Sequence, residues 1–485
     1  MCGLSAFEDV RLYNASMFTP RRRGIPWPAY IMAAIILLGL ASLYLAAPRL
    51  VSFFPQTDDG EVPASTPVRL TFSEPMNQRS VEVRFHVDPP MEGEFIWEGN
   101  SVEFFPSEPW PYHSSIEVRL DGGARSSRFL PLLGSSQWTF STGTARVVYL
   151  WPEGGPTDIY ARRMDEFEVD RLTTTPLGVM DYAIAPDGFT LVYAALRRDG
   201  GSDLRRLNSL TGEDELLYAC DEAERCQNVA VSSSNIVLFD RIAYVASASG
   251  RPAQAESRVW ALRLDSPADA YPIGTEGHDT TQGNPSQAGW AAFYDGTLRA
   301  ITIVESIDIA EPDVLNQIPN DLGLLGSWSP DGLLLLYPAI SFIQEGEVEP
   351  GAPLFYSHIY QTALPAGPSV DLSARIDISV EDSSPVTSPD GVWIAFTRKY
   401  LQAETWTLGR QLWLMRSDGS NQRQMTDEPA YTCSSPVWRF DSSALVYVRV
   451  NEGDYSRPSE IWWLDLDSGE PLQLVIGGVQ PAWLP

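Results

Sequence analysis

Few residues in this sequence combine a reactive side chain with a spacing typical of an active site. Of the four histidines, only His278 and His358 fall in the repeat-rich C-terminal part, and each stands alone. The sequence contains no Gly-x-Ser-x-Gly nucleophile elbow, no His-Glu-x-x-His and no Gly-x-x-x-x-Gly-Lys phosphate loop. We therefore expect no catalytic residue, no cofactor and no metal site, and a protein that is not an enzyme.

Carboxylates are abundant, with 63 Asp and Glu, so some pairs will lie close by chance and indicate no chemistry by themselves. The acidic run 465–470, Asp-Leu-Asp-Ser-Gly-Glu, has a composition that suggests a calcium loop. It occupies the same place between two expected strands as Arg-Ser-Asp-Gly at 416–419. A tight structural turn explains both segments, and we expect no calcium site.

The cysteines offer one candidate crosslink. Cys220 and Cys226 enclose Asp-Glu-Ala-Glu-Arg in an expected loop between strands. A disulfide between them would contribute about 2 kcal/mol in the chain-entropy model and would form in an oxidising compartment. Two unpaired thiols are the alternative, and the sequence leaves both open. The sequence has no Cys-x-x-Cys pair, so a zinc site is not expected.

Charge and composition restrict the class of protein. The formal net charge is −29, and an acidic surface repels phosphate and gains nothing from counterion release. The 38 prolines, 36 glycines and 15 tryptophans suit an all-β chain, and 485 residues exceed one ordinary domain. We expect two folded β domains and no binding to nucleic acid.

A short turn motif recurs in the C-terminal part, and an apolar strand follows each copy. Pro sets φ at about −65°, Asp bonds its own backbone, and Gly adopts a positive φ, so each copy joins two strands of a hairpin. A weaker copy, Phe-Asp-Ser-Ser, lies at 440–443. The three intact turns contain Pro186, Asp187 and Gly188; Pro330, Asp331 and Gly332; and Pro389, Asp390 and Gly391.

The third intact turn opens a pattern of four strands that continues through 411–415 and the turn 416–419. Four-stranded sheets with two apolar faces cannot bury both alone, so such repeats stack radially into a β-propeller. The string TSPDGVWIAF … QLWLMRSDGSNQRQMT resembles the Ser-Pro-Asp-Gly repeat of TolB-type propellers, which implies a propeller over residues 146–485. Six first-strand positions and a closing group made from both ends favour seven blades; six is the alternative.

Residues 61–143 have a different pattern. Val68–Phe72, Ile116–Leu120 and Gln137–Ser141 alternate apolar and polar residues, as expected for strands with one buried face. The strings TPVRLTFSEPMN, SVEFFPSEPW and WTFSTG resemble the bacterial Ig-like domain of S-layer and other surface proteins. The resemblance implies a small β-sandwich that serves as a spacer or adhesive module.

The N-terminal region predicts a membrane anchor. Residues 29–47 are apolar and uncharged, and as a helix they would span about 28 Å, the thickness of a bilayer core. A cleaved signal peptide is the alternative. Arginines at 21–23 precede this span, so the positive-inside rule predicts a cytoplasmic tail at 1–24 and a transmembrane helix at 25–48. After a linker at 49–60, all later residues would lie outside the bacterial cytoplasmic membrane.

These features favour a membrane-anchored, extracytoplasmic binding or scaffold protein whose partner is an envelope protein or a glycan. An extracytoplasmic propeller hydrolase or lyase acting on peptides or oligosaccharides is the alternative, and a laterally associating spacer is a third. A convergent carboxylate or histidine cluster in a channel mouth would favour the enzyme, whereas a rim of exposed aromatic residues would favour binding. Candidate contact loops are Ser247–Ser257, Gly274–Gln287, Gln344–Pro353 and Leu401–Gly409.

Overall fold

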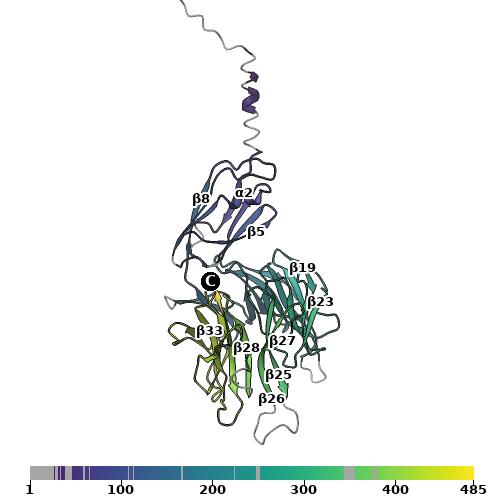
Figure 1. Cartoon of the computed structure of the whole chain (residues 1–485). Helices are drawn as coiled ribbons and strands as arrows, with labels where there is room; N and C mark the ends of the chain where they lie inside the picture. The colour runs from purple at the N-terminus through teal and green to yellow at the C-terminus, as the bar shows by residue number, and fades with distance from the viewer. Residues whose placement is uncertain are drawn as a thin grey trace, which may run out of the picture.

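The protein is almost entirely β-structure, with a small sandwich followed by a larger ring of sheets (Figure 1). This description rests on a computed structural model. It describes residues 27, 31–32, 34–38, 46–57, 61–64, 66–107, 109–112, 114–164, 168–222, 224–246, 252–342, 355–374 and 379–484.

The N-terminal domain is a sandwich of two four-stranded sheets, ordered β1-β3-β6-β5 and β2-β8-β7-β4. Alternation along the strands directs one side chain in two into a core around Phe72, Trp110 and Phe140. The first strand, β1, lies within residues 49–60, assigned above to a linker. The elements are β1 (Leu50–Phe54), β2 (Glu61–Val62), β3 (Val68–Phe72), α2 (Gln78–Glu82), β4 (Phe85–Asp88), β5 (Gly93–Glu98), β6 (Ser101–Pro106), β7 (Ser115–Leu120) and β8 (Ser136–Thr142).

The C-terminal domain is a β-propeller built from strands β9 to β36. Its strands form three four-stranded sheets and two eight-stranded sheets, and each eight-stranded sheet joins two runs of four strands through a single parallel pairing. Apolar clusters between successive sheets form the core, because the central strands are apolar on both faces. Each run of four strands is called a strand group below, and its strands are numbered first to fourth from the channel outward.

The strands of the propeller have the following bounds. They are β9 (Arg146–Trp151), β10 (Asp158–Arg163), β11 (Val169–Arg171), β12 (Val179–Ile184), β13 (Thr190–Leu196), β14 (Ser202–Asn208), β15 (Asp214–Tyr218), β16 (Glu224–Val231), β17 (Ile236–Ala246), β18 (Pro252–Arg263), β19 (Ser266–Pro272), β20 (Thr280–Pro285), β21 (Ala291–Asp295), β22 (Ala300–Val304), β23 (Val314–Pro319), β24 (Ser327–Trp328), β25 (Leu334–Phe342), β26 (Phe355–Ala363), β27 (Ser369–Asp371), β28 (Val380–Thr387), β29 (Trp393–Tyr400), β30 (Gln411–Arg416), β31 (Arg423–Gln424), β32 (Tyr431–Trp438), β33 (Ala444–Asn451), β34 (Glu460–Asp465), β35 (Pro471–Ile476) and β36 (Val479–Leu484).

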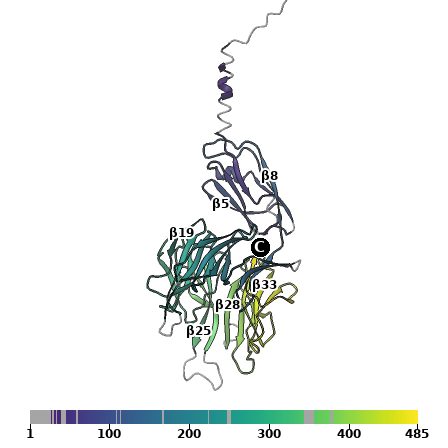
Figure 2. The same ribbon diagram turned by 180° about the vertical axis from the view of Figure 1, so that it is seen from behind.

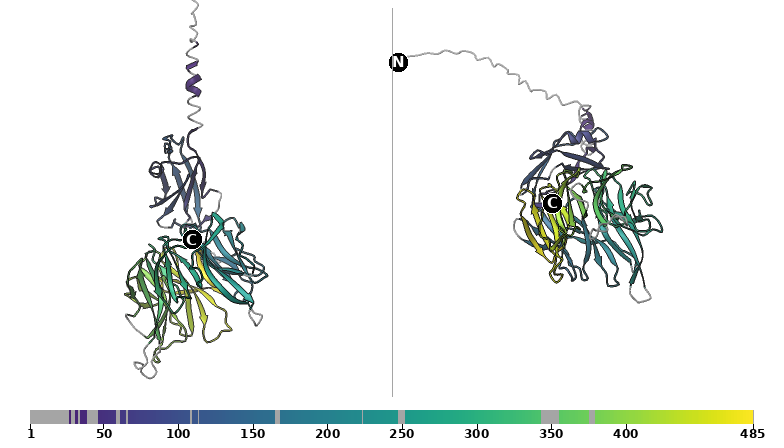
Figure 3. Two further views of the ribbon diagram at one scale, coloured as in Figure 1. Left: turned by 90° about the vertical axis from the view of Figure 1, so that its right-hand side faces the viewer. Right: turned by 60° about the horizontal axis from the view of Figure 1, so that its bottom comes forward.

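The two ends of the propeller sequence pair to close the ring. Strand β36 runs antiparallel to β9, with Ala482 opposite Val148 and Leu484 opposite Arg146, so the yellow C-terminal strand lies beside strands from the start of the domain (Figure 3). This pairing, expected from the sequence, is confirmed. It supplies the first strand that the group β9–β11 lacks and leaves no open sheet edge at the seam.

The repeated turns have the geometry that their residues favour. In each intact copy the N–H of the glycine donates to the carbonyl three residues earlier, and the glycine φ lies between 71° and 75°. The Ser329 and Ser388 hydroxyls donate to the Asp331 and Asp390 carboxylates at 2.5 Å. In the weaker copy Ser442 takes the glycine position with φ 60°. The chain therefore reverses at the same point in each of these groups.

A polar side chain links neighbouring strand groups at six seams; it is buried at five of them and half-buried at Thr157. It lies in or just before a third strand and donates to a main-chain carbonyl on or beside the first strand of the next group. At two of the seams it accompanies the single parallel pairing. The pairs are Thr157 to Val179, Ser202 to Cys226, Ser257 to Thr280, Ser357 to Asp382, Gln411 to Tyr431 and Ser459 to Gly478, at 2.5 to 3.0 Å. We call these the seam bonds.

The predicted membrane anchor is contradicted. Among the described residues, no helix combines the length and apolar composition needed to cross a membrane. The predicted membrane partner at 29–47, and a single-pass location with the N-terminus inside, are therefore not supported. The predicted tail at 1–24 lies outside the described residues.

The seam bonds predict a measurable stability effect. Ser357→Ala removes the donor to the buried Asp382 carbonyl, so the free energy of unfolding of the propeller should fall by about 1 to 3 kcal/mol. Chemical denaturation of the full chain measures this change. The exposed residue Ser266 provides the control, because Ser266→Ala should change stability by less than about 0.5 kcal/mol. Equal effects of the two substitutions would show that the seam bond contributes nothing.

Candidate functional site

The propeller has two ends, and the sandwich packs on one of them. Figures 1 and 2 show the sandwich against the end that carries the repeated turns, with the free ends of β25 and β26 pointing away from it. Phe54 lies 5.2 Å from Phe189, and Tyr112 lies 6.0 Å from Phe440, ring centroid to centroid. We call this end the turn face. The opposite end carries the connections between second and third strands, including 152–157, 401–410 and 452–459, and is called the loop face.

All exposed aromatic side chains in the described part of the propeller lie at the loop face. They are Trp151, Phe342, Trp406 and Tyr455, with 39%, 67%, 52% and 76% of their surfaces exposed. Trp151 and Phe342 end the second strands β9 and β25, and Trp406 and Tyr455 lie in the connections after β29 and β33. The four residues come from four successive strand groups around the ring. They therefore form an arc, called the aromatic arc below.

Charged neighbours hold two members of the arc. The Lys399 ammonium lies 5.3 Å from the centre of the Trp406 ring, a cation–π contact made by the single lysine in the sequence. The Tyr455 hydroxyl donates to Glu452. This hydrogen bond is the main cause of a lowered pKa at Glu452, and the nearby cations Lys399 and Arg410 contribute. The arc therefore combines exposed rings with fixed charges of both signs.

A stacked arginine supports the strands beneath Tyr455. The Arg449 guanidinium lies 4.2 Å from the Tyr431 ring centre and 3.9 Å from the Trp462 ring centre. It also forms ion pairs with Glu428 and with Glu460, the latter at 2.9 Å. Because Arg449 is buried between two rings and two carboxylates, it fixes the ends of β32, β33 and β34 relative to one another.

Two carboxylates meet at the channel on the opposite side of the ring. The Asn228 side-chain amide donates to Asp240 at 2.7 Å, and its main-chain N–H donates to Asp181 at 2.7 Å. Thr281 and the Gln282 N–H also donate to Asp240. Burial raises the pKa of both aspartates to about 6. A carboxyl with such a pKa could transfer protons, but these oxygens already tie β12, β16, β17 and β20 together.

His278 and His358, which stand alone in the sequence, each pair with a carboxylate. His278 Nδ1 lies 2.6 Å from Asp295, and the buried His358 Nδ1 lies 2.7 Å from Asp371. The two pairs belong to different sheets. In the described part of the chain, no three His, Cys, Asp or Glu residues gather in a way that could hold a metal ion.

The cysteine pair and the acidic run, which were also candidates in the sequence, have structural roles. Cys220 and Cys226 form a disulfide with Cα atoms 6.3 Å apart, and both belong to the core between β14 and β17. The acidic run 465–470 is a turn in which the Ser468 N–H donates to Asp465 at 2.8 Å. Of the candidate loops, 344–353 lies outside the described residues and Ser247–Ser257 is described in part, whereas Leu401–Gly409 contributes Trp406 to the arc.

Sequence reasoning missed most of the site. Trp151, Phe342 and Tyr455 were not predicted, since each looks like a strand end or an ordinary loop residue. A buried ion pair was also missed: Arg398 binds Asp382 through two hydrogen bonds, at 2.7 and 2.8 Å. One pattern could have indicated the arc: an aromatic residue ends or follows the second strand in several repeats. Recognising this pattern in the sequence requires knowledge of the strand boundaries.

Comparison with known proteins identifies the sandwich. Residues 46–142 match the family model described as bacterial Ig-like domain. This match confirms the predicted Ig-like domain and includes β1. It covers a minor part of the chain, so it describes the domain only. No curated protein matches the chain in sequence.

Solved structures similar to this chain include propellers of several activities. TolB from Acinetobacter baumannii is 12% identical, covering 83% of each chain with a TM-score of 0.42. An oligogalacturonate lyase in complex with manganese is 15% identical over 69% of this chain and 73% of its own, with a TM-score of 0.31. A puromycin-hydrolyzing peptidase from Mycobacterium tuberculosis is 12% identical over 86% of this chain and 57% of its own, with a TM-score of 0.47. We draw no function from these distant likenesses.

The channel aspartates predict a stability change with pH. An aspartate that titrates at about 6 when folded and at an ordinary 3.8 when unfolded destabilises the fold progressively as the pH rises between these values. Asp240→Asn removes this penalty, so the variant should gain stability relative to the parent by up to about 3 kcal/mol between pH ~4 and ~7. Urea denaturation at several pH values measures the difference. Ser266→Ala, which changes no titratable group, is the control, and a flat difference for Asp240→Asn would refute the assignment.

Proposed function

We propose that the propeller is a non-catalytic binding module that holds a protein partner on its loop face. The observation that carries this proposal is the aromatic arc of Trp151, Phe342, Trp406 and Tyr455. Large aromatic side chains are enriched in interface hot spots, and a rigid scaffold that exposes several of them together favours recognition.

The surroundings of the arc support a protein partner. Leu408 is also exposed and lies close to Gly453, so the connections 401–410 and 452–459 form one surface beside Trp406 and Tyr455. Lys399 and Glu452 border this surface and would fix the orientation of a partner through complementary charges. Apolar centres with polar rims are typical of such interfaces.

The enzyme alternative has less support. In the described residues, Asp181 and Asp240 are the only neighbouring carboxylates at the channel that both have a raised pKa. Their oxygens accept hydrogen bonds within the fold. Neither aspartate lies in the aromatic arc, and no histidine accompanies them in the hydrogen bonds. We therefore propose binding. The alternative is a hydrolase or lyase that acts on peptides or oligosaccharides, and measured turnover would favour it.

We also propose that the ring has seven blades. The strand groups supporting this count are β36 with β9–β11, β12–β15, β16–β19, β20–β23, β24–β27, β28–β31 and β32–β35. The seam bonds recur at six of the boundaries between them, which favours seven similar units over six.

A variant of the full chain tests the binding proposal. Trp406→Ala combined with Tyr455→Ala removes two neighbouring members of the arc, so affinity for a loop-face partner should fall by about tenfold or more. Crosslinking and quantitative capture from cells of the source organism, followed by binding measurements on each recovered protein, give the readout.

The matched control is Phe129→Ala in the sandwich. Phe129 is 76% exposed, as Tyr455 is, but lies in the Ig-like domain. This control should retain every partner. Partners that are lost equally from both variants, or from neither, would contradict a loop-face site, and turnover of glycans or peptides by the parent protein would contradict the non-catalytic role.

A further inference from the structure

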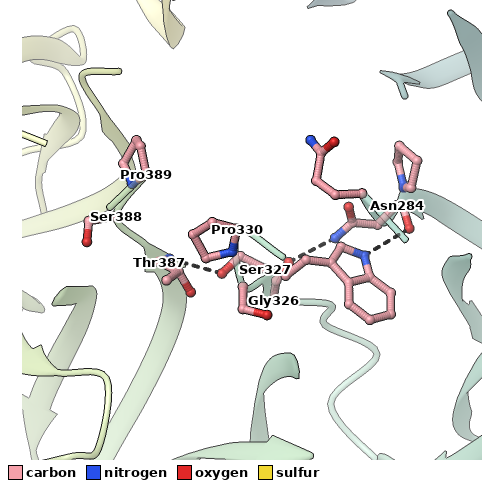
Figure 4. Close-up of a pocket in the computed structure, with 11 residues that line it drawn as sticks. Asn284, Gly326, Ser327, Pro330, Thr387, Ser388 and Pro389 are labelled. Carbon is pink, nitrogen blue, oxygen red and sulfur yellow. Dashed lines mark hydrogen bonds between the residues drawn. The ribbon is translucent and has the colours of Figure 1, made fainter. Parts of the chain in front are cut away.

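A concave site lies at the turn face, away from the aromatic arc. It is a pocket of about 560 Å³ between the first strands β20, β24 and β28, at the channel mouth (Figure 4). A volume of this size suits a ligand of a few rings. The sandwich contacts the turn face through Phe189 and Phe440, which belong to other strand groups.

The lining of this pocket is polar but uncharged. None of the eleven residues that line it is acidic or basic, although the chain contains 97 charged residues among Asp, Glu, Lys and Arg. Amide and hydroxyl groups predominate, together with prolines and one indole. Such groups both donate and accept hydrogen bonds, so they match a ligand that does the same.

Internal hydrogen bonds fix the walls of the pocket. The Trp328 indole N–H donates to the Asn284 carbonyl at 3.2 Å, and the Asn284 side-chain amide donates to the Gly326 carbonyl at 3.1 Å. The Thr387 main-chain N–H donates to the Ser327 hydroxyl at 3.1 Å (Figure 4). These bonds link three neighbouring first strands, so the polar groups are held in place before a ligand arrives.

One polar side chain of the lining remains available to a ligand. Gln287 is exposed, and its side-chain amide makes no hydrogen bond to the described residues. An amide both donates and accepts hydrogen bonds, so Gln287 can pair with a ligand hydroxyl in either role.

We infer that this pocket binds a neutral saccharide of two or three sugar rings. The ring hydroxyls would exchange hydrogen bonds with Gln287 and Ser327, while the apolar face of a sugar would pack on the half-buried Trp328 and the exposed Pro330. An anionic sugar is disfavoured, because the lining offers no cation and the net charge of the chain is −29.

This inference does not depend on the protein-binding proposal. The two sites lie at opposite ends of the propeller and share no residue, so substitutions in one leave the other intact. A saccharide bound at the turn face could therefore coexist with a protein bound at the loop face.

Titration of the purified full chain tests the saccharide site. The neutral probes are maltotriose, cellotriose and chitotriose; trigalacturonate is the anionic probe and hexaproline the peptide probe. Calorimetry and saturation-transfer NMR should detect at least one neutral trisaccharide with a Kd of about 1 mM or tighter, and trigalacturonate at least about tenfold weaker.

Variants locate the binding. Trp328→Leu removes the ring on which a sugar would pack, and Gln287→Ala truncates an exposed side chain; we expect affinity losses of about tenfold and threefold. Trp463→Leu is the matched control, because Trp463 is also half-buried but lies on β34, away from the pocket. Three results would overturn the inference: no neutral probe binding at about 10 mM, tighter binding of trigalacturonate or hexaproline, or unchanged affinity in both pocket variants.

Discussion

The propeller depends on a hydrogen bond from a buried side chain to a carbonyl of the next strand group. A four-stranded group is apolar on both faces and can bury them only against its neighbours. Apolar contact alone leaves the angle between groups adjustable, whereas a bond such as Ser202 Oγ to the Cys226 carbonyl, at 2.7 Å, fixes both position and rotation. The last such bond, from Ser459 to Gly478, occurs where Ser459 also binds Glu153 from the start of the domain. The same kind of hydrogen bond therefore positions neighbouring strand groups and closes the ring.

Ring closure divides the surface into two unequal ends. The short turns converge at one end, and their regular geometry gives the Ig-like domain a firm base through Tyr112, Phe440 and the Arg439 guanidinium, which lies 5.2 Å from the Tyr112 ring centre. The longer connections emerge at the other end, and two of them, 152–157 and 452–459, contain the seam-bond donors Thr157 and Ser459. Exposed aromatic residues are found only at that end within the described propeller. The exposed aromatic surface therefore lies at the end of the ring opposite to the Ig-like domain.

The fold followed from the sequence wherever a residue type has one strong backbone preference. Pro-Asp-Gly turns and apolar strands predicted the hairpins, and the truncated repeat at the C-terminus predicted closure by β36. The candidate sites could not be predicted from the sequence in this way. A serine that links two groups, such as Ser357, cannot be distinguished in sequence from one in a turn, because its role depends on a carbonyl 25 residues away. The exposure of Trp406 and Tyr455 likewise results from which connections share an end of the ring, a property of the closed structure alone.

The backbone of the first strands has a further feature that the sequence did not predict. Asn228, Gln282, Ser384, Ser435 and Gln480 all have positive φ, between 49° and 63°, and each lies at a register shift in a first strand. A β-bulge increases the local twist of a strand, which suits strands that converge on a narrow channel. Non-glycine residues are strained in this conformation by about 1 kcal/mol or more each, so the surrounding contacts must hold them there. At Asn228 and Gln282 the contacts are the carboxylates of Asp181 and Asp240, which accept the bulge N–H groups. The channel aspartates therefore anchor two strained bulges, a role that explains carboxylates at positions where burial opposes their charge.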